Sequence, residues 1–305
     1  MLLCNAIYLR HDMRLTAQEI EAKTMSFITA ITEIFSYPIL CTPLIVGILV
    51  SLCAALLGSV LVLKRFSMIG DGLSHVGYGA LCVAAAAGIA PLKIAIPVVI
   101  VAAFFLLRIS RNSRINGDSA IALISGTAIA VGVLTVKLAG NVNIDVGSYM
   151  FGSIVAIDNS DVVISIALSA VVILMYLLMY NGIFSVTFDE SFAKATGTKV
   201  SFYNTVVSIL TAVTIVVGMR LMGAILISSL LIFPSLTAMR FFRSFRGVVM
   251  CSAVVSTLSF FIGFVGAYIF DTPTGASVVA INAICFIIFA VAGTIKQKTS
   301  KKQCC

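Results

Sequence analysis

The amino-acid sequence predicts an all-α polytopic membrane protein with about nine transmembrane helices, eight being the alternative count. The first reason is composition: of 305 residues, 60% are hydrophobic and 10% are charged, and the mean hydropathy is +1.14. A soluble domain has about 25% charged residues, so an ordinary soluble enzyme and a disordered protein are both excluded. The other two reasons are that the apolar residues gather in nine long stretches, and that the basic residues lie at the ends of these stretches.

The nine stretches are expected to be helices that cross the bilayer. A bilayer core of about 30 Å needs about 20 apolar residues in a helix. Lipid offers no partner for backbone amides, which excludes open strands, and strands of a closed barrel would alternate in hydropathy, which these stretches do not. In chain order they are Ile39–Leu63, Ile69–Ala90, Leu92–Leu107, Ser119–Leu138, Val162–Tyr180, Val200–Met219, Leu221–Met239, Gly247–Phe270 and Thr274–Ile295.

Several regions need separate treatment. The adjoining stretches between Val200 and Met239 are expected to be two short helices with a turn near Arg220, and Asn141–Asp158 is a candidate for a re-entrant piece. Residues 1–24 form a polar N-terminal extension that lacks the apolar core of a signal peptide. Either Met25 is the natural start, or residues 1–24 are a disordered or surface-helical leader. The transmembrane domain then covers residues 25–295, and residues 296–305 form a basic tail.

The basic residues predict the orientation of the chain. There are 20 Lys and Arg against 12 Asp and Glu, a formal net charge of +8. If nine helices alternate, 14 basic residues fall on the side of the C-terminus and 6 on the other side. Loops rich in Lys and Arg remain cytoplasmic, so the C-terminus is expected to be cytoplasmic. The positive charge is thereby explained by the lipid bilayer as partner, without nucleic acid.

Several enzyme chemistries lack their residues in this sequence. There is no G-x-x-x-x-G-K-[ST] phosphate-binding loop and no H-E-x-x-H motif. An aspartyl protease would need a second central membrane Asp besides Asp71, and Ser74 and His75 are adjacent, so they point in different directions on a helix. The 8 cysteines include no C-x-x-C pair and lie mostly in apolar stretches, which indicates neither a disulfide framework nor a zinc knuckle. No catalytic residues are therefore expected.

Asp71 and His75 are the candidate metal ligands. They are the only ionisable residues well inside a stretch, where a charge costs at least about 2.5–3.5 kcal/mol. Their spacing of four residues places both on one helical face. A carboxylate oxygen and an imidazole nitrogen form half of a four-ligand zinc site, and manganese or ferrous iron would also accept them. The alternatives are a local Asp–His hydrogen bond or a position near the membrane interface.

Glycines flank this pair, at positions 70, 72, 77 and 79. Small residues at such spacing allow close helix approach. Two copies packed at this point would bring two Asp and two His side chains together.

The segment 187–197 predicts a short amphipathic helix on the cytoplasmic side. Thr187 and Glu190 have the spacing of a capping box, with Thr187 as N-cap and Glu190 at N3. Phe188 and Phe192 are four residues apart and are expected to share a face. Gly197 suits the position just after a helix end. The alternative is an interfacial helix that lies on lipid headgroups.

At these residues the sequence resembles the membrane permease subunits of ABC-type zinc/manganese uptake systems. Arg65–His75 resembles the family's second-helix motif, Asn143–Gly152 an extracytoplasmic loop and Phe188–Gly197 its coupling helix. Met222–Arg240 is the longest match, and Asp271–Gly275 resembles the last outer loop. The matches follow the family's order from about residue 39 to 295. The zinc branch is favoured, chiefly through Asp271–Gly275.

The resemblance implies a homodimer that binds two cytoplasmic ABC ATPase subunits and receives metal from an extracytoplasmic metal-binding protein, in the bacterial cytoplasmic (inner) membrane. The partner ATPase, not this chain, would hydrolyse ATP. Asp71 and His75 would be a transient site for the transported metal, with zinc favoured and manganese the alternative, and no cofactor would be permanently bound. Phe188, Asp189, Glu190, Phe192 and Gly197 would bind the ATPase.

Three other functions remain as alternatives. A secondary metal-ion carrier would be expected to show interrupted spans in matched halves, and the sequence shows no such pair. A permease for a larger metal chelate would have a wide pathway that does not need a central Asp and His. A membrane enzyme is the alternative with the least support.

Overall fold

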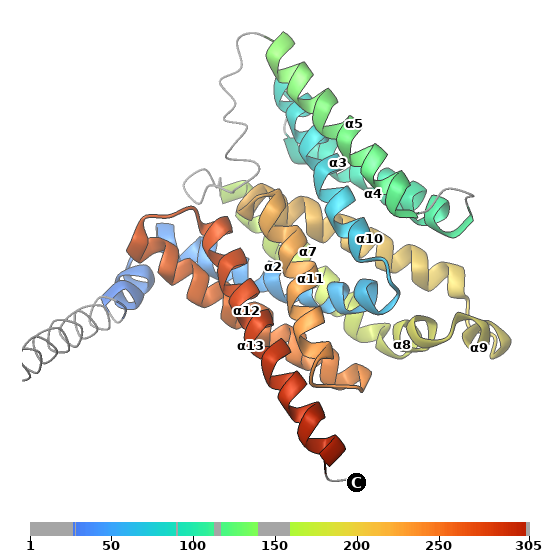
Figure 1. Ribbon diagram of the computed structural model, residues 1–305. Helices are drawn as coiled ribbons and strands as arrows, with labels where there is room; N and C mark the ends of the chain where they lie inside the picture. Colours follow the sequence, from blue (N-terminus) through green and yellow to red (C-terminus); the bar gives the residue numbers. More distant parts are fainter. Residues whose placement is uncertain (1–26, 28, 90, 113–116, 140–158, 303–305) are drawn as a thin grey trace, which may run out of the picture.

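The computed structural model describes residues 27, 29–89, 91–112, 117–139 and 159–302, and in these ranges the chain is helical apart from short turns (Figure 1). The candidate re-entrant piece within 141–158 and the extension 1–24 lie outside the described residues. The helices are α2 (Pro38–Leu63), α3 (Ser67–Ala86), α4 (Pro91–Asn112), α5 (Gly117–Leu138), α7 (Asn159–Leu178), α8 (Tyr180–Phe188), α9 (Glu190–Ala195), α10 (Val200–Met222), α11 (Ala224–Met239), α12 (Phe245–Phe270) and α13 (Thr274–Lys302).

The predicted class is confirmed at the level of an all-helical membrane protein. Each of the nine apolar stretches coincides largely with one helix. Six helices in the described ranges, α2, α5, α7, α10, α12 and α13, are long and apolar enough to cross a membrane. The apolar parts of α4 and α11 are shorter. The last helix, α13, continues to Lys302, so it runs into the residues expected to form the basic tail.

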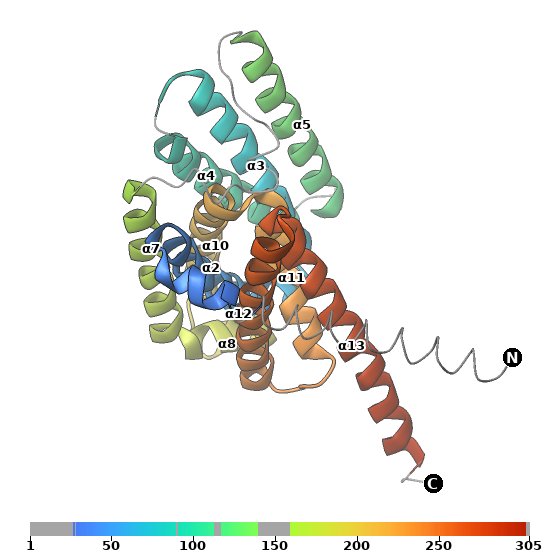
Figure 2. The ribbon, with the colours of Figure 1, turned by 90° about the vertical axis from the view of Figure 1, so that its left-hand side faces the viewer.

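The helices form a bundle with a central layer and two flanks. The two ribbon views agree that α3, α4 and α5 lie together on one side, and that α12 and α13 lie on another (Figures 1 and 2). Helices α2 and α11 lie between these groups and contact both, whereas α10 packs against α3 and α4 of the first group and against α2 and α11. In the most apolar window, 78% of α2 and 72% of α10 is buried, against 17% of α5 and of α13. The outer helices therefore carry an exposed apolar surface of the kind that lipid covers.

Small polar side chains join α12 to the central helices α2 and α11. The hydroxyl of Ser256 on α12 donates to the carbonyl of Ser51 on α2 at 2.9 Å. The Ser252 hydroxyl approaches that of Ser235 on α11 at 3.2 Å. All four side chains are fully buried. Hydrogen bonds of this kind stabilise helix contacts in a membrane, where the hydrophobic effect does not drive helices together.

Helices α10 and α11 meet at Gly223, not at Arg220. Gly223 has φ 91° and ψ 158°, a conformation that is essentially restricted to glycine. The break expected near Arg220 is therefore three residues later. Only α11 is short, because α10 has 23 residues.

Arg220 lies in the last turn of α10 and forms an ion pair with Asp161 on α7. The Nε and Nη2 atoms of Arg220 both lie 2.9 Å from Oδ2 of Asp161. The two side chains are only 21% and 13% exposed. Such a pair is costly to break, because removal of one partner leaves a buried uncompensated charge. It fixes the start of α7 against the end of α10.

Candidate functional site

The candidate metal ligands lie on α3, which packs closely against other helices of the same chain. A Cβ atom added to Gly79 would lie 2.5 Å from the carbonyl oxygen of Ala128 on α5, so only glycine allows this approach. The close approach expected from the glycines is therefore confirmed, but between helices of one chain. The glycines do not by themselves indicate a contact between two copies.

The structure brings Asp71 and His75 together on one face of α3. Nε2 of His75 lies 3.5 Å from Oδ2 of Asp71. The Asp71 side chain is 41% exposed and that of His75 is 21% exposed, so both can still reach a ligand. The hydroxyl of Ser74 donates to the backbone carbonyl of Asp71 at 2.7 Å and leaves the carboxylate available.

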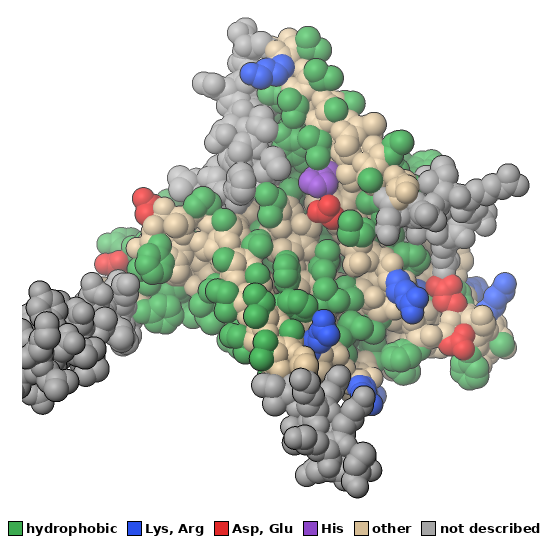
Figure 3. All heavy atoms as spheres, in the orientation of Figure 1, with side chains coloured by type: hydrophobic (Ala, Val, Ile, Leu, Met, Phe, Trp, Pro, Cys, Tyr) green, Lys and Arg blue, Asp and Glu red, His purple; other side chains and the backbone are tan. Residues whose placement is uncertain are grey.

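The pair is bordered by α5 and α11. A Cβ atom on Gly72 would contact Ile121 of α5, and one on Gly70 would contact Leu231 of α11. The hydroxyl of Ser228, one turn before Leu231, donates to the carbonyl of Ile225 within α11 at 3.1 Å. Figure 3 shows a histidine (purple) beside an acidic side chain (red), surrounded mainly by apolar (green) and uncharged (tan) atoms. An exposed polar pair in such surroundings is a candidate binding site.

The described residues of one chain offer only part of the ligands that a metal ion needs. Among the described residues, no group of three or more His, Cys, Asp and Glu side chains could hold a metal ion. Asp71 and His75 provide one oxygen ligand and one nitrogen ligand, whereas zinc is usually bound by four ligands. The geometry therefore suits a weak site or a site completed from elsewhere.

The N-cap predicted for the segment 187–197 is wrong. Thr187 lies in the last turn of α8 and its hydroxyl donates to the carbonyl of Ile183 at 2.6 Å. Asp189 is the N-cap of α9, and its Oδ1 atom accepts hydrogen bonds from the amides of Ser191 and Phe192, both at 2.9 Å. Glu190 is therefore the first residue of α9, not N3 of a capping box. The extended backbone of Asp189 explains the choice, because an N-cap residue must leave helical geometry.

The end of α9 agrees with the sequence prediction. Gly197 has φ 85°, and its amide donates to the carbonyl of Lys194 at 3.2 Å. The amide of Thr198 donates to the carbonyl of Ala193 at 2.9 Å. This pair of bonds is a Schellman motif with glycine at C′. The helix itself, Glu190–Ala195, has six residues and is shorter than the expected segment 187–197.

Phe188 and Phe192 are exposed, but they do not share one helix. Phe188 ends α8, and its ring packs against those of Phe184 at 5.2 Å and Phe245 at 6.1 Å between centroids. Phe192 belongs to α9. The two residues are 59% and 64% exposed. The expectation that the two rings share one helical face is therefore not met, because the extended backbone of Asp189 separates α8 from α9.

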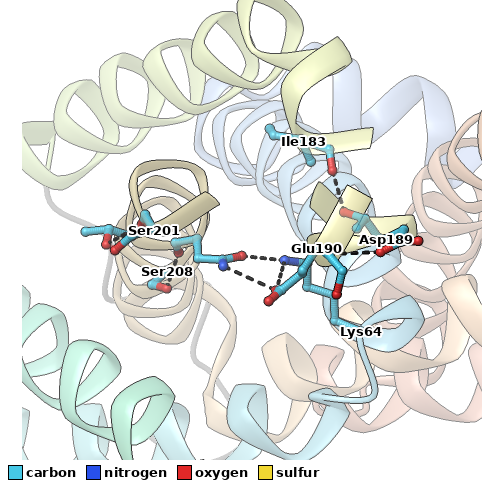
Figure 4. Close-up of polar contacts among 10 residues, drawn as sticks. Lys64, Ile183, Asp189, Glu190, Ser201 and Ser208 are labelled. Carbon is cyan, nitrogen blue, oxygen red and sulfur yellow. Dashed lines mark hydrogen bonds and ion pairs between the residues drawn. The ribbon is translucent and has the colours of Figure 1, made fainter. Parts of the chain in front are cut away.

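A polar cluster that the sequence did not predict joins α9 to the bundle. Nζ of Lys64, at the end of α2, donates to Oε1 of Glu190 at 3.2 Å and to Oδ1 of Asn204 on α10. Nδ2 of Asn204 donates to the same Glu190 oxygen at 3.3 Å. Figure 4 shows the Lys64 amine directed toward this carboxylate. One carboxylate oxygen of Glu190 is thus held against the bundle by Lys64 and Asn204.

Known proteins share this arrangement of helices. The sequence profile of the ABC 3 transport family matches residues 36–293. The chain belongs to the ABC 3 transport family. Among its relatives, the high-affinity zinc uptake system membrane protein ZnuB of Haemophilus influenzae is 30% identical over 253 residues, which are 83% of this chain and 97% of ZnuB.

A permease named for manganese import and a chain of a solved structure have a similar sequence identity to this chain. The manganese import system permease protein ScaB of Streptococcus gordonii is 28% identical over 245 residues, which are 80% of this chain and 88% of ScaB. A chain of the structure of PsaBC from Streptococcus pneumoniae in complex with Fab has a TM-score of 0.77 and 27% identity, over 86% of this chain and 94% of that chain. The resemblance inferred from the motifs is confirmed by this ABC 3 membership.

Proposed function

We propose that this ABC 3 family member is the permease subunit of an ATP-driven importer of zinc or manganese, and that two copies form the translocation pathway. The observation that carries the proposal is the exposed Asp71–His75 pair on α3, in a chain whose described residues include six apolar helices long enough to span a membrane. A relative is named for zinc uptake and another for manganese import, at 30% and 28% identity. The substrate class is therefore a divalent metal, and the choice between the two metals stays open.

A homodimer would complete the metal site. Each copy contributes one carboxylate and one imidazole, so two copies supply four ligands, the number that zinc prefers. A transport site must also release its metal, and a site shared between two moving subunits can do so when they separate. The metal is the transported substrate, and no resident cofactor is proposed.

The energy would come from a cytoplasmic ABC ATPase subunit that binds at α9, because the sequence has no phosphate-binding loop of its own. An extracytoplasmic metal-binding protein would deliver the metal from the other side. The proposed topology has about nine transmembrane helices, with eight as the alternative, and it places α9 and the C-terminus in the cytoplasm, in a bacterial inner membrane. The excess of basic residues on that side supports the orientation.

The proposed function is tested with the complex purified from cells that coexpress the permease, its ATPase and its metal-binding protein. Reconstituted in vesicles, the complex is expected to hydrolyse ATP faster when the binding protein carries zinc or manganese than when magnesium alone is present. The metal should accumulate inside only with ATP. Uptake that follows an ion gradient without ATP would instead indicate a secondary carrier, and would overturn the proposal.

The orientation gives a separate prediction. In a variant without cysteines, Arg243→Cys should be protected from an impermeant thiol reagent in intact cells, and Thr272→Cys should react. Both positions are exposed in the structure, whereas Thr274, the first residue of α13, is only 8% exposed and would react poorly. Both cysteines should react after the membrane is permeabilised. Labelling of position 243 and protection of position 272 in intact cells would reverse the orientation.

A further inference from the structure

We propose that Lys64 is a positioning residue that links α9 to the metal-site helix, so that movement of α9 by the ATPase changes the position of Asp71 and His75. This inference rests on the proposed function, because it takes α9 as the element that the ATPase moves. It adds a residue to the transport mechanism that belongs neither to the metal pair nor to the exposed docking surface.

The first support is the closed triangle of contacts around the Lys64 amine. It donates to both Glu190 and Asn204, and Asn204 donates to Glu190 in turn, so three elements meet at one point (Figure 4). The Lys64 side chain is only 9% exposed. Hydrogen bonds between a charged donor and a carboxylate are about twice as strong as neutral ones. A displacement of Glu190 with α9 would therefore act directly on the end of α2.

The second support is the short corner between Lys64 and α3. Lys64 is the C-cap of α2, and α3 begins at Ser67. The corner is closed by hydrogen bonds from the amide of Arg65 to the carbonyl of Val62 at 3.0 Å and from that of Phe66 to Leu61 at 2.8 Å. Arg65 has φ 61°, a left-handed conformation that is unusual for a residue other than glycine. Because only Arg65 and Phe66 separate Lys64 from α3, a displacement of Lys64 would also displace the start of α3.

The third support is that the elements joined by Lys64 both lead to the metal pair. With a rise of 1.5 Å per residue, Asp71 and His75 lie about 6 Å and about 12 Å along α3 from its first residue. From Asn204, α10 continues through Gly223 into α11, whose Leu231 packs against α3 at Gly70, next to Asp71. Lys64 and Asn204 therefore lie near the starts of two chain segments, α3 and α10–α11, that both extend to the Asp71–His75 pair.

The test compares Lys64→Met with Lys199→Met in the complete complex with ATPase and binding protein, reconstituted in vesicles and supplied with zinc and ATP. Lys199 is exposed on the same side of the chain and precedes α10, so its substitution removes the same charge outside the triangle. Zinc uptake and ATP hydrolysis are measured in the same vesicles, and their ratio is the readout. A protein that only folds less well loses both rates in proportion and keeps the ratio.

The Lys64→Met complex is expected to retain its ATPase subunit and to hydrolyse ATP at a rate near that of the wild type, whereas zinc transported per ATP falls by about tenfold, within the usual range of coupling between sites. Lys199→Met should keep the wild-type ratio. Asn204→Leu should lower the ratio in the same direction, and the double variant should lower it no further, because contacting residues of one network are not additive.

An unchanged ratio in Lys64→Met would overturn the inference while leaving the proposed function intact. If Lys64→Met does not assemble, the ratio in Asn204→Leu decides in the same way. A wild-type complex whose ATP hydrolysis does not respond to zinc or manganese would contradict the proposed function itself, and this inference with it.

Discussion

Replacement of Asp71 or His75 with alanine is expected to abolish metal uptake while the protein still reaches the membrane. Each variant removes one ligand from each of two copies, so a four-ligand site would keep only two. The described residues of the chain offer no group of three or more metal-binding side chains that could take over. Loss of a residue that only orients a metal ligand already costs about 10–100-fold, so loss of a ligand should reduce uptake by about 100-fold or more.

The measurement is uptake of zinc and of manganese in cells that lack other importers, with the amount of protein in the membrane determined in parallel. Ser74→Ala is the matched control, because Ser74 lies between the two ligands and its hydroxyl bonds only to a backbone carbonyl in the structure. It should transport normally. Either alanine variant transporting at the wild-type rate would remove the pair from the site. His75→Asp should shift preference toward manganese, because an oxygen ligand replaces a nitrogen ligand.

The helices and the candidate ligands could be predicted from sequence because they depend on local composition. An apolar stretch of about 20 residues has few alternatives to a membrane helix, and a spacing of four residues places Asp71 and His75 on one face in any helix. Gly197 was likewise predictable, because its role as a helix stop depends on its own backbone angle.

The polar contacts between distant segments could not be predicted in this way. In the sequence, Lys64 is one of the 14 basic residues on the side of the C-terminus, and its partners Glu190 and Asn204 lie 126 and 140 residues away. The sequence predicts a turn near Arg220 but not its partner Asp161, which lies 59 residues away. Such pairs are fixed by how helices pack. One signal was available: a charge next to a span needs a partner when it is buried.

The error at Thr187 has a local cause. Thr187 and Asp189 are both acceptable N-cap residues, and the capping-box spacing to Glu190 favoured Thr187. The structure continues α8 through Thr187, whose hydroxyl bonds back to the preceding turn. This correction matters for the docking hypothesis, because it places Phe188 and Phe192 on either side of the cap residue Asp189.

Replacement of both Phe188 and Phe192 with alanine is expected to release the ATPase while the permease inserts normally. Both rings are more than half exposed, and they lie on the side of the bundle that carries the excess of basic loops. An aromatic anchor in a protein interface is typically worth about 2 kcal/mol or more. Two such losses would weaken binding by about 10³ if they are roughly additive, at 1.4 kcal/mol per tenfold.

The conformation of Gly197 provides a second variant with its own control. Space around Gly197 is open, so a side chain would meet no neighbour, and only the backbone conformation distinguishes the substitutions. Gly197→Val should impair coupling, because a β-branched residue rarely adopts positive φ. Gly197→Asn should be tolerated, because asparagine also occurs at this position of a Schellman motif.

Co-purification of the ATPase with the permease decides between a docking surface and a lipid-facing surface. Phe270→Ala is the matched control for the loss of an exposed ring: Phe270 is 64% exposed and ends α12, whereas Phe245, which contacts Phe188, begins the same helix. If Phe188 and Phe192 face lipid, their removal should leave the complex intact, as Phe270→Ala should. A double variant that retains its ATPase and transports normally would show that α9 lies on the membrane surface, and the ATPase would then have to bind elsewhere on the cytoplasmic side.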